Sequence, residues 1–383
     1  MATVAGNSSS TTFTAEGAVS ISFNALVSSP LSLTASIEKA FGSHPDSLGI
    51  IIVRDLPPTY TPARERLLRL AYRFANLEPN VRERYADSKS RYSFGWSHGK
   101  EIMNGKPDTM KGSYYANPVL DAPDVSAELR QAYPEYYGKN IWPTATAEVG
   151  EFEEAFKDLG GFVFKVGCQL AVACQPFASS YLSDSSLSLS NLIGSSQTVK
   201  ARLLHYFPPS PENPLPAEDE AIDSWCGFHL DHSLLTGLCS VRFPSSYPDR
   251  PASEDAYYFT HQAMYLHKQP MGEPTVVQSP SPTSGLYIRT RGGDLTKVSI
   301  PVDCLAFQTG EALELATAGK LRATPHCVRV GAAPDAEKIS RETFALFMQP
   351  NVDQQLSATE NFGQFSKRIF DEHYKDESAG TAM

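Results

Sequence analysis

Three side chains that can bind a metal ion lie within four positions of one segment, FHLDHSLLTGL at 228–238: His229, Asp231 and His232. If this segment is a strand, residues two apart point to the same face, so His229 and Asp231 converge while Leu230 turns toward the core. His232 then points away from Asp231 and is interpreted as structural, unless a β-bulge reverses its direction. The spacing therefore predicts two ligands of a metal site.

A third ligand is expected on another strand. The leading candidate is His326 in KLRATPHCVRV (320–330), because it ends a turn-rich stretch and precedes alternating apolar residues. Two histidines and one carboxylate on one face leave adjacent coordination positions open, which is the arrangement of non-haem Fe(II) oxygenases. A structural zinc site would close its coordination shell instead. A single His-x-Asp pair is more often structural, so the assignment depends on the surrounding sequence.

The elements that must position these residues begin with a predicted sheet. AVSISFNAL (18–26) alternates polar and apolar residues, and SLGIIIVRDL (47–56) is a continuous apolar run that suits a strand buried on both faces. Between them, LTASIEKAF (33–41) fits a short helix. We expect the two strands to belong to one sheet.

Two longer helices are predicted further along the chain. The segment 60–77 has Thr61 placed to cap a helix and a one-sided apolar pattern, and 147–174 repeats apolar residues at spacings of three and four. Between them, 85–140 is rich in Tyr, Gly, Pro and Lys and has little periodicity. This stretch is predicted to be irregular chain on the surface of the core.

From Val199 onward, short β-like runs separated by turns dominate, which favours a sandwich or a jelly roll. Helices first and strands second, without a long linker, predict one compact α+β unit. The expected divisions are a tail at 1–18, an N-terminal region at 19–140, a core of long helix and jelly roll at 141–375 with an insertion near 243–284, and a tail at 376–383.

The composition argues against several classes of partner. The chain has 33 Lys and Arg against 43 Asp and Glu, a net charge of −10, and no basic cluster, which disfavours nucleic acid and anionic membranes. Its six cysteines lack C-x-x-C spacing and indicate a reducing compartment. The start of the chain has no secretory-signal pattern, and no apolar run reaches the roughly 18 residues of a membrane span. We expect a soluble cytosolic protein that acts on a small molecule.

Several segments, in order, resemble the Fe(II)/2-oxoglutarate oxygenases of the isopenicillin N synthase-like family. They are FHLDHSLLTGL, the stretch from GLYIRT to CVRV (285–330) and SRETFALFMQP (340–350), together with GSYYANP (112–118), NIWP (140–143) and LLHYFPPSPENP (203–214). The resemblance covers most of the chain. It implies a distorted double-stranded β-helix, or jelly roll, with His229, Asp231 and His326 as ligands of Fe(II).

A cosubstrate site is expected after the last ligand. Arg341 and Thr343, two apart on a predicted strand, place a guanidinium and a hydroxyl on one face, which suits a carboxylate. The family resemblance implies that they bind the distal carboxylate of 2-oxoglutarate, which is consumed with dioxygen. Where many relatives have Asn-x-Tyr, this chain has His205-Tyr206-Phe207. That hydrogen bond to the cosubstrate is therefore missing or supplied by His205.

Substrate identity is weakly encoded. The resemblance nominates residues of the N-terminal region, whose cationic and aromatic groups would suit a small anionic or zwitterionic metabolite such as an amino-acid derivative. The outcome of C–H oxidation could be hydroxylation, desaturation or ring closure. The substrate candidates are Arg91, Phe94, Trp96, Lys100, Tyr115 and Asn117.

Three alternatives stay open. An isopenicillin N synthase-like oxidase would use the same iron triad without 2-oxoglutarate. A non-catalytic ligand-binding protein would keep only the fold, and a zinc hydrolase would use the same ligands. The Pro/Ser/Tyr-rich insertion, part of the 94 residues between Asp231 and His326, is interpreted as a lid or an oligomer contact, and it contains a spare histidine, His261.

Overall fold

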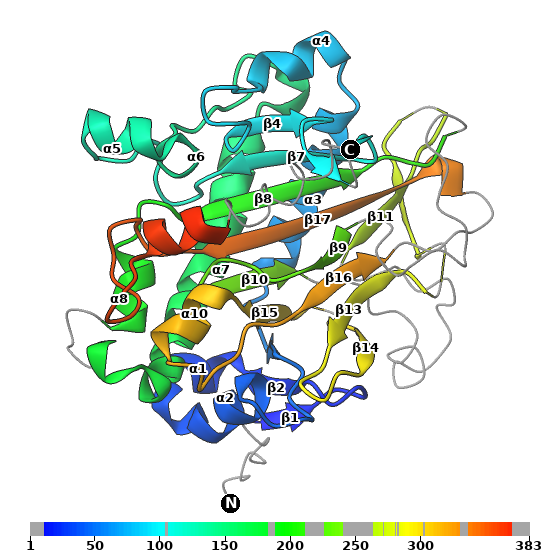
Figure 1. Ribbon diagram of the computed structural model, residues 1–383. Coiled ribbons are helices and arrows are strands. Elements are labelled where there is room, and N and C mark those ends of the chain that lie inside the picture. The colour runs from blue at the N-terminus through cyan, green and yellow to red at the C-terminus, as the bar shows by residue number, and fades with distance from the viewer. Residues whose placement is uncertain are drawn as a thin grey trace, which may run out of the picture.

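The chain, seen in a computed structural model, is built around two facing β-sheets with helices on the outer side of the larger sheet (Figure 1). None of the described helices combines the length and apolar character that a membrane crossing requires. The structure describes residues 11–103, 106–182, 188–210, 226–239, 263–270, 272–279, 281, 283–301, 303–329 and 336–369.

The larger sheet is mixed and follows the order β1-β2-β3-β15-β10-β17-β8-β7-β4, with β11 and β12 attached beside β17. Strands β2 and β3 lie in one sheet, as predicted. They pair in parallel, and the other pairs are antiparallel. The strands are β1 Thr11–Phe13, β2 Val19–Ser22, β3 Ile50–Arg54, β4 Gly95–His98, β7 Lys111–Ala116, β8 Lys200–Tyr206, β10 Leu235–Cys239, β11 Met264–His267, β12 Thr275–Val277, β15 Leu305–Thr309 and β17 Ile339–Met348.

The smaller sheet has the order β14-β13-β16-β9 and lies in front of the larger one in Figure 1. Buried apolar residues of both sheets, among them Ile52, Leu238 and Ile288, form one cluster between them. Removing this apolar surface from water holds the two sheets together. The strands are β9 Cys226–His229, β13 Gly285–Arg289, β14 Leu295–Val298 and β16 His326–Arg329, and a separate hairpin pairs β5 Ile102–Met103 with β6 Lys106–Pro107.

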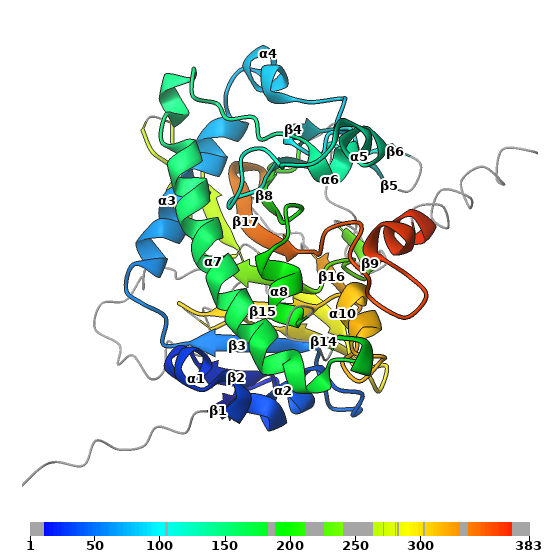
Figure 2. The ribbon, with the colours of Figure 1, turned by 90° about the vertical axis from the view of Figure 1, so that its left-hand side faces the viewer.

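Two long helices cover the outer face of the larger sheet. Figure 2 shows α7 running across the molecule with α3 beside it. The apolar face predicted for α3 is buried, as is that of α7, which begins at Phe152 after a 3-10 turn at Ala147–Val149. The helices are α1 Phe23–Ser28, α2 Thr34–Phe41, α3 Tyr60–Ala75, α4 Pro79–Arg82, α5 Ala127–Ala132, α6 Pro134–Tyr137, α7 Phe152–Cys174, α8 Leu189–Gly194 and α10 Glu311–Ala316.

Two predictions for the N-terminal region are wrong in part. Residues 11–13 were expected in a tail, but they form β1 and pair with β2. The alternating segment 18–26 is a strand only as far as Ser22, after which α1 begins. Thr61 does not cap α3: the residue before the helix is Thr59, and the Thr61 hydroxyl donates to the Asp303 carboxylate at 2.9 Å. Residues 1–10 and 370–383 lie outside the described part of the chain.

The prediction of irregular chain over 85–140 is also wrong, because this stretch supplies β4 and β7 to the larger sheet, as well as α5 and α6. These strands lack apolar alternation because polar residues occupy buried positions, where each has a polar partner. Lys111 pairs with Asp108 at 2.9 Å, and the Ser113 hydroxyl accepts a hydrogen bond from Arg202 at 3.0 Å. Polar residues matched in this way leave no hydrophobic period for sequence reasoning to detect.

Candidate metal centre

The structure brings the three predicted metal ligands together between the two sheets. His229 ends β9 and His326 begins β16, and the two residues face each other in the pairing of these strands. One possible ligand atom of each of His229, Asp231 and His326 lies within 4.8 Å of the others. Asp231 and His326 are buried, whereas the side chain of His229 is 41% exposed. The cluster is therefore anchored in the core and open on one side.

Asp231 reaches this position in a different way from the one predicted. Strand β9 ends at His229, so Asp231 follows the strand and is fixed by other contacts. Its backbone carbonyl accepts a hydrogen bond from the amide of Glu311 at 2.8 Å, and its Oδ2 accepts one from the Thr236 hydroxyl at 2.6 Å. Its Oδ1 lies 3.7 Å from Nε2 of His229. Oδ2, which Thr236 fixes, lies 3.9 Å from Nε2 of His326, so each carboxylate oxygen lies near one of the two imidazoles.

Backbone carbonyls set the orientation of both imidazoles. Nδ1 of His229 lies 2.8 Å from the carbonyl oxygen of Gly227, and Nδ1 of His326 lies 2.9 Å from that of Thr324. Because a carbonyl only accepts, each Nδ1 carries the proton and each Nε2 keeps a lone pair for a metal. Burial lowers the pKa of His326, although the Asp231 carboxylate opposes this effect, so the ring favours its neutral, metal-binding form.

The triad lines a cavity of about 80 Å³. Arg341 and Thr343 line the same cavity from β17. Arg341 is 3% exposed, and its Nε and Nη1 have no hydrogen-bond partner among the described residues. Its guanidinium lies 4.6 Å from the ring centroid of Tyr206. A buried guanidinium with unpaired donors is suited to binding a carboxylate from outside the protein.

His205 does not take the predicted place beside the cosubstrate. Its Nδ1 lies 2.9 Å and 3.0 Å from the two oxygens of Glu342, and both residues are almost fully buried. Side chains alternate along β8, so Tyr206 faces the cavity while His205 faces α3, where Tyr72 contacts its ring at 6.1 Å. The next residue, Tyr206, lines the cavity instead.

None of the described residues that line this cavity is among the six substrate candidates. Phe94 and Trp96 are core residues, each 2% exposed, and Trp96 packs against Phe74 with ring centroids 5.2 Å apart. Asn117 closes a turn, because its side-chain oxygen accepts hydrogen bonds from the amides of Val119 and Leu120. These three residues support the fold at some distance from the cavity lining.

The remaining three candidates also lie outside the cavity. The Arg91 side chain is 73% exposed, and Lys100 pairs with Glu83 at 3.6 Å. Tyr115 donates its hydroxyl to Glu101 at 2.8 Å. Tyr115 is thus linked to the cavity through Arg202, which pairs with the same carboxylate and whose guanidinium lies 5.2 Å from the Tyr115 ring centroid.

Sequence reasoning missed four cavity residues: Tyr206, Arg202, Thr236 and Gln308. Arg202 donates to both oxygens of Glu101 at 2.8 and 3.0 Å. Burial would raise the pKa of Glu101, but the cations beside it prevail and hold that pKa at about 2. Alternation along β8, counted from Tyr206, would have placed Arg202 on the cavity face.

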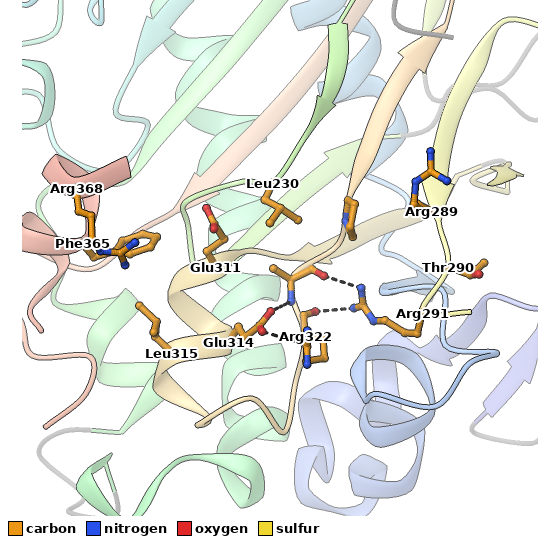
Figure 3. Close-up of a pocket in the computed structure, with 12 residues that line it drawn as sticks. Leu230, Arg289, Thr290, Arg291, Glu311, Glu314, Leu315, Arg322, Phe365 and Arg368 are labelled. Atoms are coloured by element: carbon orange, nitrogen blue, oxygen red, sulfur yellow. Dashed lines mark hydrogen bonds and ion pairs between the residues drawn. The ribbon is translucent and has the colours of Figure 1, made fainter. Parts of the chain in front are cut away.

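A second pocket is lined by Leu230, the residue between the two ligands in sequence (Figure 3). Arg291 lies in it and donates to the carbonyls of Ala323 and Arg322, each at 2.6 Å. Arg322 in turn pairs with Glu314 at 3.0 Å. These charges are matched within the protein, and Leu230 lines a pocket where the strand pattern predicted core.

The spare histidines do not join the triad in the described part of the chain. His232 points to Glu311, with 3.8 Å between Nε2 and Oε2, in agreement with its structural interpretation. His261 and residues 240–262 of the insertion lie outside the described residues.

Comparison with known proteins gives a likeness in structure only. No family model matches the chain, and no curated protein matches its sequence. The fold is that of solved structures described as 2OG-Fe(II) oxygenases. A Caulobacter crescentus protein described as belonging to that family has a TM-score of 0.58 at 19% identity, covering 92% of this chain and 98% of that chain.

Two further structures were solved with small molecules bound. A Neurospora crassa protein in complex with alpha-KG and 5-formyluracil has a TM-score of 0.56 at 16% identity, covering 89% of this chain and 88% of that chain. JOX2, in complex with 2OG, Fe and JA, has a TM-score of 0.51 at 15% identity, covering 92% of this chain and 83% of that chain. At such identities the likeness establishes the fold alone.

Proposed function

We propose that this protein is a non-haem Fe(II)- and 2-oxoglutarate-dependent oxygenase that oxidises an unactivated C–H bond of a small molecule. The single observation that carries the proposal is one cavity holding both the His229, Asp231 and His326 cluster and the buried, unpaired guanidinium of Arg341. The fold shared with 2OG-Fe(II) oxygenase structures supports it. We assign the two facing sheets to a distorted jelly roll, with the region before residue 141 packed around it.

The donor set fits a ferrous ion. Two neutral imidazoles and one carboxylate form a facial triad, and the chain supplies no fourth ligand from the described His, Cys, Asp and Glu residues. Iron held there would supply activation of dioxygen and the oxidising power for C–H cleavage. The residues of the chain hold the triad: Thr236 fixes Asp231, and the carbonyl of Thr324 fixes His326.

Arg341 and Thr343 fit the distal carboxylate of 2-oxoglutarate. Burial strengthens the attraction between a guanidinium and a carboxylate. Nε and Nη1 of Arg341 have no hydrogen-bond partner among the described residues, so both can donate to a bound carboxylate. The Tyr206 ring lies against the guanidinium and limits its movement, so the carboxylate would be bound in one orientation. Tyr206 thus replaces His205 in the proposed cosubstrate site.

The substrate is expected to be a small molecule. The Neurospora crassa and JOX2 structures contain 5-formyluracil and JA in addition to the cosubstrate, which supports a substrate of similar size here. Hydroxylation, desaturation and ring closure all begin with removal of hydrogen from carbon, and the cavity determines which carbon is presented. The cationic residues Arg91 and Lys100 lie outside the cavity lining. They therefore no longer support the prediction of an anionic or zwitterionic substrate.

The test is titration of the purified protein with Mn(II), which is inert to oxygen chemistry here, followed by titration with 2-oxoglutarate. Arg341→Leu should retain Mn(II) binding and lose at least about 10-fold in 2-oxoglutarate affinity, because a charged hydrogen-bonded pair is removed. Arg91→Leu, a matched change of an exposed arginine, should bind both ligands normally. Turnover with Fe(II) should release succinate.

Each alternative predicts a different result. Iron-dependent substrate oxidation without 2-oxoglutarate consumption would favour an isopenicillin N synthase-like oxidase. Absence of metal binding would favour a non-catalytic ligand-binding protein. Hydrolysis supported by Zn(II) would favour a zinc enzyme.

A further inference from the structure

Gln308 lies on β15, and its buried amide faces the cavity. It is 1% exposed, it lines the cavity, and neither Oε1 nor Nε2 has a hydrogen-bond partner among the described residues. Gln349 provides a contrast, because it is 7% exposed and its Nε2 donates to the carbonyl of Thr198 at 2.6 Å. Buried amides are nearly always hydrogen-bonded, so the Gln308 amide is expected to meet a partner that enters the cavity.

Gln308 lies beside the groups that hold two of the three metal ligands. In the pairing of β10 with β15 it faces Thr236, whose hydroxyl bonds Asp231. The next residue, Thr309, bonds the hydroxyl of Thr324 at 2.9 Å, and the carbonyl of Thr324 orients the third ligand, His326. A molecule at the open side of the triad would therefore lie near the Gln308 amide.

This amide is remote from Arg341. Thr236 faces Phe347 in the pairing of β10 with β17, and Phe347 is six residues from Arg341 (347 − 341). At about 3.3 Å per residue the two positions are on the order of 20 Å apart along the strand. The carboxylate proposed for Arg341 cannot also occupy Gln308, so the two residues would bind different groups.

No arginine or lysine among the described lining residues is free to bind an anion near Gln308. Of the two arginines among the described lining residues, Arg341 is distant and Arg202 is paired with Glu101. The wall nearby includes the apolar side chains of Leu238 and Val328. A glutamine amide presents one acceptor beside one donor group, which matches the N–H and C=O edge of another amide or a lactam.

We infer that Gln308 is a specificity-determining residue that hydrogen-bonds a neutral amide or lactam group of the organic substrate. This inference rests on the proposed function, in which Arg341 binds the cosubstrate. It replaces the anionic or zwitterionic substrate predicted from the sequence with a neutral, partly apolar one.

The first arm of the test uses the metal-free protein and needs no ligand. Gln308→Met removes an unpaired amide at nearly constant volume, so its unfolding temperature should equal or exceed that of the wild type. Gln349→Met, the matched control, removes a satisfied hydrogen bond and should lower it. If both variants are destabilised alike, the Gln308 amide serves the fold and the inference is overturned.

The second arm uses protein loaded with Zn(II), which is diamagnetic, and with 2-oxoglutarate, observed by ligand NMR. The probes are the lactam 2-piperidone and the carboxylate cyclohexanecarboxylate. Wild type should prefer the lactam, and Gln308→Met should bind it roughly 10-fold more weakly, as loss of two neutral hydrogen bonds implies. Preference for the carboxylate, absence of lactam binding, or unchanged binding by the variant would overturn the inference.

Calorimetric titration with Zn(II) and 2-oxoglutarate separates the two proposals. If the protein binds neither Zn(II) nor 2-oxoglutarate, the oxygenase assignment is rejected. The unfolding temperatures of the variants would still decide whether the Gln308 amide lacks a structural partner. Normal metal and cosubstrate binding with no lactam selectivity would reject only the role of Gln308.

Discussion

Gly310 is predicted to hold the metal centre together by its lack of a side chain. Its backbone, at φ −103° and ψ 175°, is open to any residue, so conformation does not require glycine. Space does: a Cβ at this position would lie 2.1 Å from the carbonyl oxygen of Ser233 and 2.6 Å from that of Asp231. Ordinary contact begins at 3.4 Å, so Gly310→Ala must displace the backbone beside Asp231 by about 1.3 Å (3.4 − 2.1).

The displacement acts on both stability and metal binding. Overpacking of this size costs about 1–3 kcal/mol. The amide of Glu311, which bonds the Asp231 carbonyl, follows Gly310 directly, so the ligand should move with the strain. Changes in the groups that support a metal ligand typically reduce metal affinity by about 10–100-fold, and we expect a loss in this range.

Urea unfolding of the metal-free protein and Mn(II) titration measure the two effects. Gly161→Ala is the matched control, because a Cβ there meets nothing within 4 Å and α7 should gain about 0.5–1 kcal/mol from the change. A Gly310→Ala protein that binds Mn(II) with wild-type affinity would refute the reasoning. It would mean that Asp231 is positioned without this close backbone contact.

Three further changes probe other parts of the site. Thr236→Val removes the donor to Asp231, so Mn(II) affinity should fall about 10-fold; an equal affinity would discount this hydrogen bond. His205→Ala leaves the buried Glu342 without its imidazole and should cost about 3 kcal/mol in urea unfolding, while 2-oxoglutarate binding stays unchanged; weakened binding would restore the original prediction. The folded-state pKa of Glu101, about 2 against an ordinary 4.5, adds stability that is present above pH 4.5 and lost as pH falls toward 2. In acid unfolding, the free energy of unfolding of Glu101→Gln should therefore change less over that pH window than that of the wild type. An equal change in the two proteins would contradict the lowered pKa of Glu101.

The gathering of the three candidate metal ligands was predictable from residue type, short spacing and the family resemblance. The pair of His229 and Asp231 two residues apart, and His326 before an alternating run, converge as expected. Arg341 and Thr343 likewise share the cavity face because they alternate on one strand. For Arg341 and Thr343 the residue type indicates the chemistry and the strand period gives the direction, whereas Asp231 lies beyond the end of β9 and is directed by its own hydrogen bonds.

The parts that failed depend on contacts that no local pattern encodes. Ser113 is buried beside Arg202 of β8, which is distant in the chain, and Lys111 beside Asp108, so β7 shows no apolar period. His205 looked suited to a ligand because the register of β8 was unknown, and one residue separates the cavity face from the helix face. Gln308 gave no signal at all, since an unpaired amide is recognised only when its surroundings are known.

The pairing of His326 with His229 makes two candidate metal ligands dependent on the alignment of β9 and β16. A slip by one residue would turn one imidazole to the opposite face of the smaller sheet. Only correctly aligned molecules could then capture an ion, and capture would favour that alignment by mass action. The molar ratio of bound metal to protein would therefore measure the fraction of correctly aligned molecules, even before a substrate is known.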